Sequence, residues 1–222
     1  MRMEFTRLIE IVGDEPVFET ALLLAGDVDP ADVRRQLSRW TRAGRLYQLR
    51  RGLYALAPPF QRVKPHPFLV ANRLVRASYV SLQSALAHHG LIPEVVPVTT
   101  SVTTARPGRW GTPLATYEYR HIKGALLFGY SLTNLGGGQR AFVATPEKAL
   151  LDLVHLQPGG DAPEYLSELR LQNLERLDLD QLRDQAARAE SPKLRRAAAS
   201  VVELAQAEAL AYETPALEYE TR

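Results

Sequence analysis

The sequence predicts an α+β protein with an N-terminal winged helix-turn-helix followed by a C-terminal mixed α+β domain, a small sheet covered by helices with a helical C-terminal end. The first 60 residues contain three apolar segments and then two short strand-like runs around a turn. A proline-rich stretch follows, and beyond it β-branched runs are enclosed by helical patterns. The length of 222 residues suits two domains of ordinary size.

The first two apolar segments predict helices. The first carries apolar residues at the i, i+3, i+4, i+7 spacing of an amphipathic helix and ends at Gly13; these residues are Phe5, Leu8, Ile9 and Val12. The second, residues 17–25, has a blurred period and stops at Gly26-Asp27. We expect it to be a short buried helix.

The third segment has the clearest start and stop signals, which predict a helix over residues 30–43. Asp29 suits the N-cap, Pro30 the first helical position, Asp32 the place of a capping-box acid and Gly44 the stop. Its apolar face is formed by Val33, Leu37 and Trp40. Its opposite face is polar and mostly cationic, with Arg34, Arg35, Ser38, Arg39, Thr41 and Arg42.

The runs 45–49 and 53–56 predict a β-hairpin whose tip is Arg50-Arg51-Gly52. Residues 31–64 hold nine basic residues and a single acid, which favours a polyanionic partner. Three helices with a basic third helix, then a hairpin with a basic tip, are the parts of a winged helix-turn-helix. A solvated charged face is the alternative, and the wing makes DNA binding the favoured interpretation.

The DNA-binding candidates follow from that geometry: Arg34, Arg35, Ser38, Arg39, Arg42, Arg45, Arg50 and Arg51. The helix would enter the major groove, and its N-terminal side chains, Arg34, Arg35 and Ser38, would meet base edges. The remaining arginines would contact phosphates, with the wing also able to reach the minor groove.

The stretch from Pro58-Pro59 to Pro67 predicts an extended connector. We therefore expect domains at 1–60 and 65–212, and a frayed tail at 213–222. The second domain should contain helices at 67–76, 81–89, 147–155, 162–172, 181–189 and 192–211, and strands at 96–104, 115–121, 125–132 and 139–144, the last two joined by a turn at 136–138.

Composition excludes several classes. The chain has no cysteine, so disulfides, thiolate metal sites and cysteine nucleophiles are absent. No apolar run approaches the roughly 18 to 20 residues that span a bilayer, and no signal-peptide pattern opens the sequence. We expect a cytoplasmic protein without a membrane partner.

Nothing in the sequence argues strongly for an enzyme. Glu147 and Lys148 are adjacent at a helix start, whereas a restriction-type nuclease needs them on alternating strand positions; we interpret them as helix-terminus charges. Glu118 and Arg120 have the i, i+2 spacing but no placed aspartate partner. Ser81 is interpreted as a cap, and a loop at 136–138 lacks the Lys-Ser/Thr of a phosphate-binding loop.

Metal ligation has little more support. His88-His89 and the Asp152/His155 pair specify no third ligand, and His89 lies on an apolar stripe. We expect no catalytic residue, no metal and no cofactor. Tyrosines at 79, 117 and 119 accompany several arginines; a core role is favoured over a nucleic-acid surface.

Three motifs in order resemble the AbiEi family, over roughly residues 5–204. They are LRRGLYA at 49–55, YVSLQSAL at 79–86 followed by HGLI at 89–92, and TPEKALLD at 145–152. The resemblance implies a winged-helix repressor that binds double-stranded DNA upstream of its own gene, within a type IV toxin-antitoxin operon. It also implies a C-terminal antitoxin domain that opposes a nucleotidyltransferase-like toxin, without a stable complex being required.

Two alternatives remain open. The chain could be a protein-interaction module whose C-terminal domain binds a partner, with the basic helix merely solvated. It could also be a stand-alone regulator without a toxin. A metal-dependent nuclease ranks last. Oligomeric state and operator sequence are not encoded in any recognisable motif.

Overall fold

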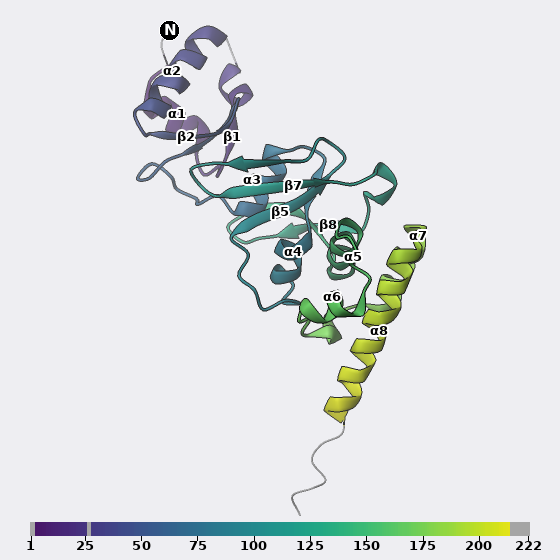
Figure 1. Cartoon of the computed structure of the whole chain (residues 1–222). Helices are drawn as coiled ribbons and strands as arrows, with labels where there is room; N and C mark the ends of the chain where they lie inside the picture. Colours follow the sequence, from purple (N-terminus) through teal and green to yellow (C-terminus); the bar gives the residue numbers. More distant parts are fainter. Residues whose placement is uncertain (1–2, 26–27, 214–222) are drawn as a thin grey trace, which may run out of the picture.

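The computed structural model describes residues 3–25 and 28–213, and shows the mixed α+β architecture that was predicted (Figure 1). It has a small antiparallel sheet near the N-terminus and a six-stranded mixed sheet surrounded by helices. The expected tail, residues 213–222, lies outside the described residues from 214 onward. No helix in the described part of the chain is both long and apolar enough to cross a bilayer.

The N-terminal unit contains three short strands and three helical segments. Its elements in order are α1 (Phe5–Val12), β1 (Phe18–Glu19), the 3-10 helix η1 (Thr20–Leu24), α2 (Pro30–Arg42), β2 (Leu46–Arg50) and β3 (Leu53–Leu56). The strands are antiparallel in the order β1-β3-β2. The first helix, the third helix and the hairpin agree with the sequence prediction.

The second predicted helix is wrong in part. Its first residues form β1, in which Phe18 pairs with Tyr54 of β3, and only Thr20–Leu24 is helical, as a 3-10 turn. The rings of Phe18 and Tyr54 stack at 5.9 Å. The free edge of β3 offers backbone hydrogen-bonding groups that need partners, and this tertiary demand decides the conformation of a run without a helical period.

Helix α2 begins and ends where its caps predict. The Asp29 carboxylate accepts a hydrogen bond from the Ala31 N–H at 2.9 Å. Asp32 does not complete a capping box; it forms an ion pair with Arg35 instead. At the other end Gly44 takes a φ of 70°, and the Arg45 N–H donates to the Trp40 carbonyl at 2.9 Å, which turns the chain into β2.

The larger sheet has the order β6-β7-β5-β4-β9-β8. Its strands are β4 (Ser78–Val80), β5 (Val98–Thr103), β6 (Gly108–Gly111), β7 (Thr116–His121), β8 (Tyr130–Asn134) and β9 (Arg140–Ala144). Strands β4 and β6 were not predicted, because three or four residues are too few to show an alternating pattern. The expected strand 125–132 is instead the 3-10 helix η2 (Gly124–Leu126) followed by β8.

Helices surround this sheet, and the C-terminal ones stack at one end of the molecule (Figure 1). They are α3 (Pro67–Leu74), α4 (Leu82–His88), α5 (Pro146–Leu156), α6 (Pro163–Glu168), the 3-10 helix η3 (Leu174–Arg176), α7 (Leu179–Arg188) and α8 (Pro192–Glu213). Helix α6 is shorter than predicted because Arg170 takes a φ of 47°. Helix α7 is capped by Asp178, which accepts from the Gln181 N–H, and not by Asp180.

Two apolar cores correspond to the two sheets. The N-terminal core packs Leu8, Val33, Leu37 and Trp40 against the small sheet. The second core fills the larger unit, and it also takes in Leu53 on the inner side of the hairpin. The N-terminal unit is therefore packed onto the C-terminal one through its hairpin.

Candidate nucleic-acid interface

The exposed face of α2 carries the predicted cationic row. Arg34, Arg35, Ser38, Arg39 and Arg42 are all solvent-exposed along it. Three of these side chains have partners on the same helix: Arg35 pairs with Asp32, and the Arg42 guanidinium donates to Ser38 Oγ at 3.0 Å. The guanidinium groups of Arg34 and Arg39 have no hydrogen-bond or ion-pair partner within residues 3–25 and 28–213, so they are free to meet an external anion.

The buried face of α2 fixes the direction of this cationic row. Val33, Leu37 and Trp40 are each at most 2% exposed, as the sequence pattern predicts. The Trp40 ring contacts the Phe5 ring of α1, with centroids 5.3 Å apart. Because three side chains on successive turns are locked in the core, the opposite arginines point into solvent.

Arg45 and Arg51 differ in their surroundings. Arg45, just after α2, is exposed, and its guanidinium lies 5.0 Å from the centre of the Phe5 ring. That cation–π contact holds its charge beside the α2 face. Arg51 is exposed in the hairpin turn, and its guanidinium has no partner among the described residues.

Arg50, at the tip of the hairpin, is engaged within the chain. Its side chain is 33% exposed, and its guanidinium donates to the Arg73 carbonyl of α3 at 3.3 Å. Glu19 of β1 lies 3.7 Å away and also holds Arg76 at 3.1 Å. The hairpin tip thus contacts the C-terminal unit, while α2 lies toward the far end of the N-terminal unit (Figure 1).

Sequence reasoning missed these junction residues. Glu19 falls in the segment predicted as helix, and nothing in its neighbours signals that it would face two arginines from distant positions. The predicted set is therefore divided by the structure: seven residues remain exposed on α2, beside it or on the turn, and Arg50 is engaged within the chain.

A buried polar cluster around Asp152 was not predicted from the sequence. Asp152 of α5 accepts hydrogen bonds from Tyr79 Oη at 2.9 Å and Ser81 Oγ at 2.8 Å, and forms an ion pair with Lys148. The Lys148 and Asp152 side chains are 3% and 2% exposed. Burial raises the pKa of Asp152 and lowers that of Lys148, and their mutual attraction opposes both shifts.

This cluster gives structural partners to residues whose types also occur in catalytic sites. Ser81 is at the N-cap of α4 as predicted, but its hydroxyl serves Asp152 and makes no cap bond. Lys148 pairs with the Asp152 carboxylate. Glu147, predicted as a helix-terminus charge, lies in the first turn of α5, where it is buried and accepts from the Asp178 N–H at 2.9 Å. The solvent-inaccessible position of the cluster makes it a cross-link between β4, α4 and α5.

The three tyrosines predicted as core residues are buried. Tyr79, Tyr117 and Tyr119 are core residues, at most 1% exposed, and burial raises the pKa of Tyr117 to about 12. One ring nitrogen of His89 lies 2.8 Å from the Ala144 carbonyl. Within the described ranges, three or more His, Asp or Glu side chains nowhere come together as metal ligands would.

Comparison with known proteins adds a likeness at the level of the fold. No family model and no curated protein matches the chain. A crystal structure of the RV2827C protein from Mycobacterium tuberculosis is similar, with a TM-score of 0.50 and 17% sequence identity over 90% of this chain and 80% of that one. At this identity the likeness concerns the fold alone.

Proposed function

We propose that this protein is a sequence-specific double-stranded-DNA-binding transcriptional repressor, with residues 1–60 as a winged helix-turn-helix and α2 as the recognition helix. The observation that carries the proposal is the two-sided character of α2. One side is locked in the core by Trp40 and its neighbours, and the other presents four exposed arginines together with Ser38. Such a rigid cationic helix face suits the major groove.

The roles of the individual residues follow from their positions. Arg34, Arg35 and Ser38, nearest the start of α2, would contact base edges, and Arg39, Arg42, Arg45 and Arg51 would contact phosphates. Arg50 is reassigned from DNA contact to positioning, because its guanidinium is held by Glu19 and the Arg73 carbonyl. It would hold the hairpin, and with it the N-terminal unit, against α3 of the C-terminal unit.

The resemblance to the AbiEi family extends the proposal to autoregulation of a type IV toxin-antitoxin operon and antitoxicity of the C-terminal domain, residues 65–212. Activity on DNA would place the chain in the cytoplasm. If a nucleotidyltransferase-like gene adjoins its own, co-expression of this chain should restore growth to cells that express that gene. Continued growth arrest would restrict the function to regulation.

The central test is fluorescence-anisotropy titration of DNA from upstream of the gene, and of a scrambled duplex, at several salt concentrations. We expect a preference of at least roughly 10³-fold for the upstream DNA. With about four to six phosphates neutralised, the slope of log K against log salt should be near −4 to −5.

Matched variants make the test specific. Arg34→Ala should remove most of the preference, since a bidentate base contact contributes about 1–3 kcal/mol of discrimination. Arg39→Ala should weaken binding to both duplexes and reduce the salt slope by about 1. Arg195→Ala, an exposed helical arginine on α8, is the control. Equal weak binding of both duplexes by all variants would reject the repressor proposal and favour a protein-interaction module.

A further inference from the structure

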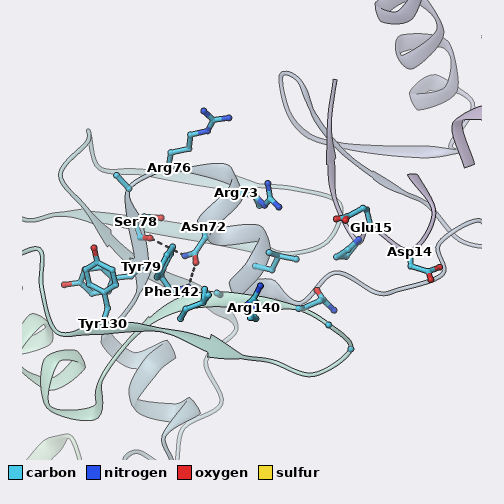
Figure 2. Close-up of a pocket in the computed structure, with 18 of the residues that line it drawn as sticks. Asp14, Glu15, Asn72, Arg73, Arg76, Ser78, Tyr79, Tyr130, Arg140 and Phe142 are labelled. Carbon is cyan, nitrogen blue, oxygen red and sulfur yellow. Dashed lines mark hydrogen bonds between the residues drawn. The ribbon is translucent and has the colours of Figure 1, made fainter. Parts of the chain in front are cut away.

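A groove of about 1050 Å³ lies where the N-terminal unit meets the larger sheet (Figure 2). One wall is the loop after α1 with Asp14 and Glu15, another is α3 with Arg73, and the third is the face of β8 and β9. None of the DNA-binding candidates on α2 lines it. It is therefore a second recess with its own chemistry.

The β8–β9 wall exposes an aromatic and aliphatic surface. Tyr130, Leu132 and Phe142 are 36%, 49% and 45% exposed, and Leu132 is the cross-strand neighbour of Phe142. The Tyr130 ring stacks on the buried Tyr79 ring, with centroids 4.4 Å apart and an interplanar angle of 17°. The Phe142 ring contacts the Tyr130 ring edge-on, with centroids 5.7 Å apart. These rings are held in place from beneath and present apolar surface to the groove.

The Tyr130 ring is also anchored indirectly to the buried cluster. Tyr79, on which it stacks, donates its hydroxyl hydrogen to Asp152 at 2.9 Å. The aromatic wall is thus preorganised, which lowers the entropic cost of stacking a planar ligand on it.

Two exposed guanidinium groups lie beside the aromatic wall. The side chains of Arg73 and Arg140 are exposed and make no hydrogen bond or ion pair within the described part of the chain, whereas Arg76 forms an ion pair with Glu19. In Figure 2, Arg73 and Arg140 lie between the aromatic end, marked by Tyr130, and the acidic end, marked by Asp14 and Glu15. An anionic group bound there would face two cations directly next to the rings.

We propose that this groove binds a mononucleotide, with its base against Tyr130 and Phe142 and its phosphates on Arg73 and Arg140. Aromatic rings accept any nucleobase by stacking, and guanidinium groups bind phosphate oxygens in pairs. The volume suits a ligand of this size. The end of a single-stranded nucleic acid has the same chemistry, but its continuing phosphates would meet Asp14 and Glu15, which favours the mononucleotide.

Isothermal titration calorimetry of the full chain tests this without reference to DNA repression. ATP and UTP serve as purine and pyrimidine probes, and tripolyphosphate, adenosine and a ten-residue oligothymidylate as comparison ligands. We expect at least one nucleotide to bind more tightly than tripolyphosphate, adenosine or the oligonucleotide. Arg140→Ala should weaken that binding about tenfold, the loss of one charge-assisted contact.

Further variants separate stacking from folding. Phe142→Leu keeps an apolar exposed side chain and should also weaken nucleotide binding about tenfold, while Phe142→Trp should retain it. Arg109→Ala, an exposed arginine on β6 at the opposite edge of the sheet, should bind as the wild type does. The circular-dichroism melting curve of each variant checks that the fold is kept.

Several results would overturn the proposal. Absence of heat with both nucleotides would refute it, as would equal binding of tripolyphosphate, which needs no aromatic wall. Tighter binding of the oligothymidylate would assign the groove to single-stranded nucleic acid. Unchanged nucleotide affinity in Arg140→Ala or Phe142→Leu would place the bound nucleotide elsewhere.

Discussion

Replacing Asp152 by asparagine should destabilise the protein strongly, because Asp152 is the acceptor for three buried donors. Tyr79 and Ser81 donate to one of its oxygens at 2.9 and 2.8 Å, and Lys148 pairs with the other. The amide in Asp152→Asn keeps the shape but has no charge and adds donors where donors already converge. The Lys148 ammonium is then buried without a counter-charge.

Two limits set the magnitude of this loss at pH 7. Removing one partner of a buried ion pair costs about 3–5 kcal/mol. Lys148 can also escape by losing its proton; from its ordinary pKa of 10.5, neutralising it at pH 7 costs about 5 kcal/mol. Because the protein adopts whichever state costs less, deprotonation of Lys148 limits the loss of unfolding free energy to about 5 kcal/mol.

The second route also makes the loss depend on pH. Burial lowers the pKa of Lys148, and the attraction of Asp152 opposes this shift. Asp152→Asn removes that attraction, so the folded-state pKa of Lys148 should lie further below its unfolded value; the unfolded state then binds more protons and stability rises with pH. At pH 9 neutralising Lys148 costs only about 2 kcal/mol. The difference between variant and wild type should therefore shrink from about 3–5 to about 2 kcal/mol between pH 7 and pH 9.

Urea unfolding followed by far-ultraviolet circular dichroism at both pH values measures the two differences. Asp184→Asn, an exposed position on α7, is the matched control and should stay within about 0.5 kcal/mol of wild type. A loss below about 1 kcal/mol at pH 7 in Asp152→Asn, or an equal loss at both pH values, would show that the buried ammonium does not carry the effect.

Three further perturbations probe other parts of the chain. Trp40→Ala should lower the unfolding free energy of the N-terminal unit by about 3–5 kcal/mol. Leu22→Ala, at a half-exposed position, should lower it far less. Retained cooperative melting of that unit in Trp40→Ala would contradict the packing described for α2. Burial, and to a smaller extent the neighbouring histidines, lowers the pKa of His88. The unfolding free energy should therefore fall as the pH drops below about 6.5, and it should fall less steeply in His88→Gln. Melting temperatures of the two proteins that change in parallel from pH 7.5 to 5.5 would contradict this prediction. Glu19→Gln removes the charge that pairs with two arginines at the junction, and it should speed tryptic cleavage in the connector 57–66. The unfolding free energy should fall by only about 0.2–1 kcal/mol. An unchanged cleavage rate would mean that Glu19 does not stabilise the junction.

Helix α2 shows how much of the candidate interface local signals could predict. Asp29 and Pro30 mark its start, Gly44 its end, and Trp40 belongs to its buried face, all as the sequence indicates. These features depend on neighbours within one or two helical turns, so they can be recognised without the rest of the chain. The exposure of the arginine row follows from the same periodicity.

Arg50 and Asp152 show what local signals could not supply. The partners of Arg50, Glu19 and the Arg73 carbonyl, are 31 and 23 positions away, and Asp152 meets Tyr79 73 positions away. The residues themselves do not reveal whether such a side chain will be solvated or held. The two short strands β4 and β6 likewise exist because longer strands pair with them.

Periodicity, caps and turn residues act over a few positions, and they were sufficient to predict the α+β class, most of the elements and the cationic face of α2. Contacts between distant segments were needed to show that Arg50 serves the junction between the units and that Lys148 and Asp152 share a buried pair. They were also needed to place Arg73 and Arg140, whose side chains have no partner within the described residues, beside the exposed rings of Tyr130 and Phe142. Each of these depends on the free energy of bringing distant segments into contact, which is set by the packing of the whole chain.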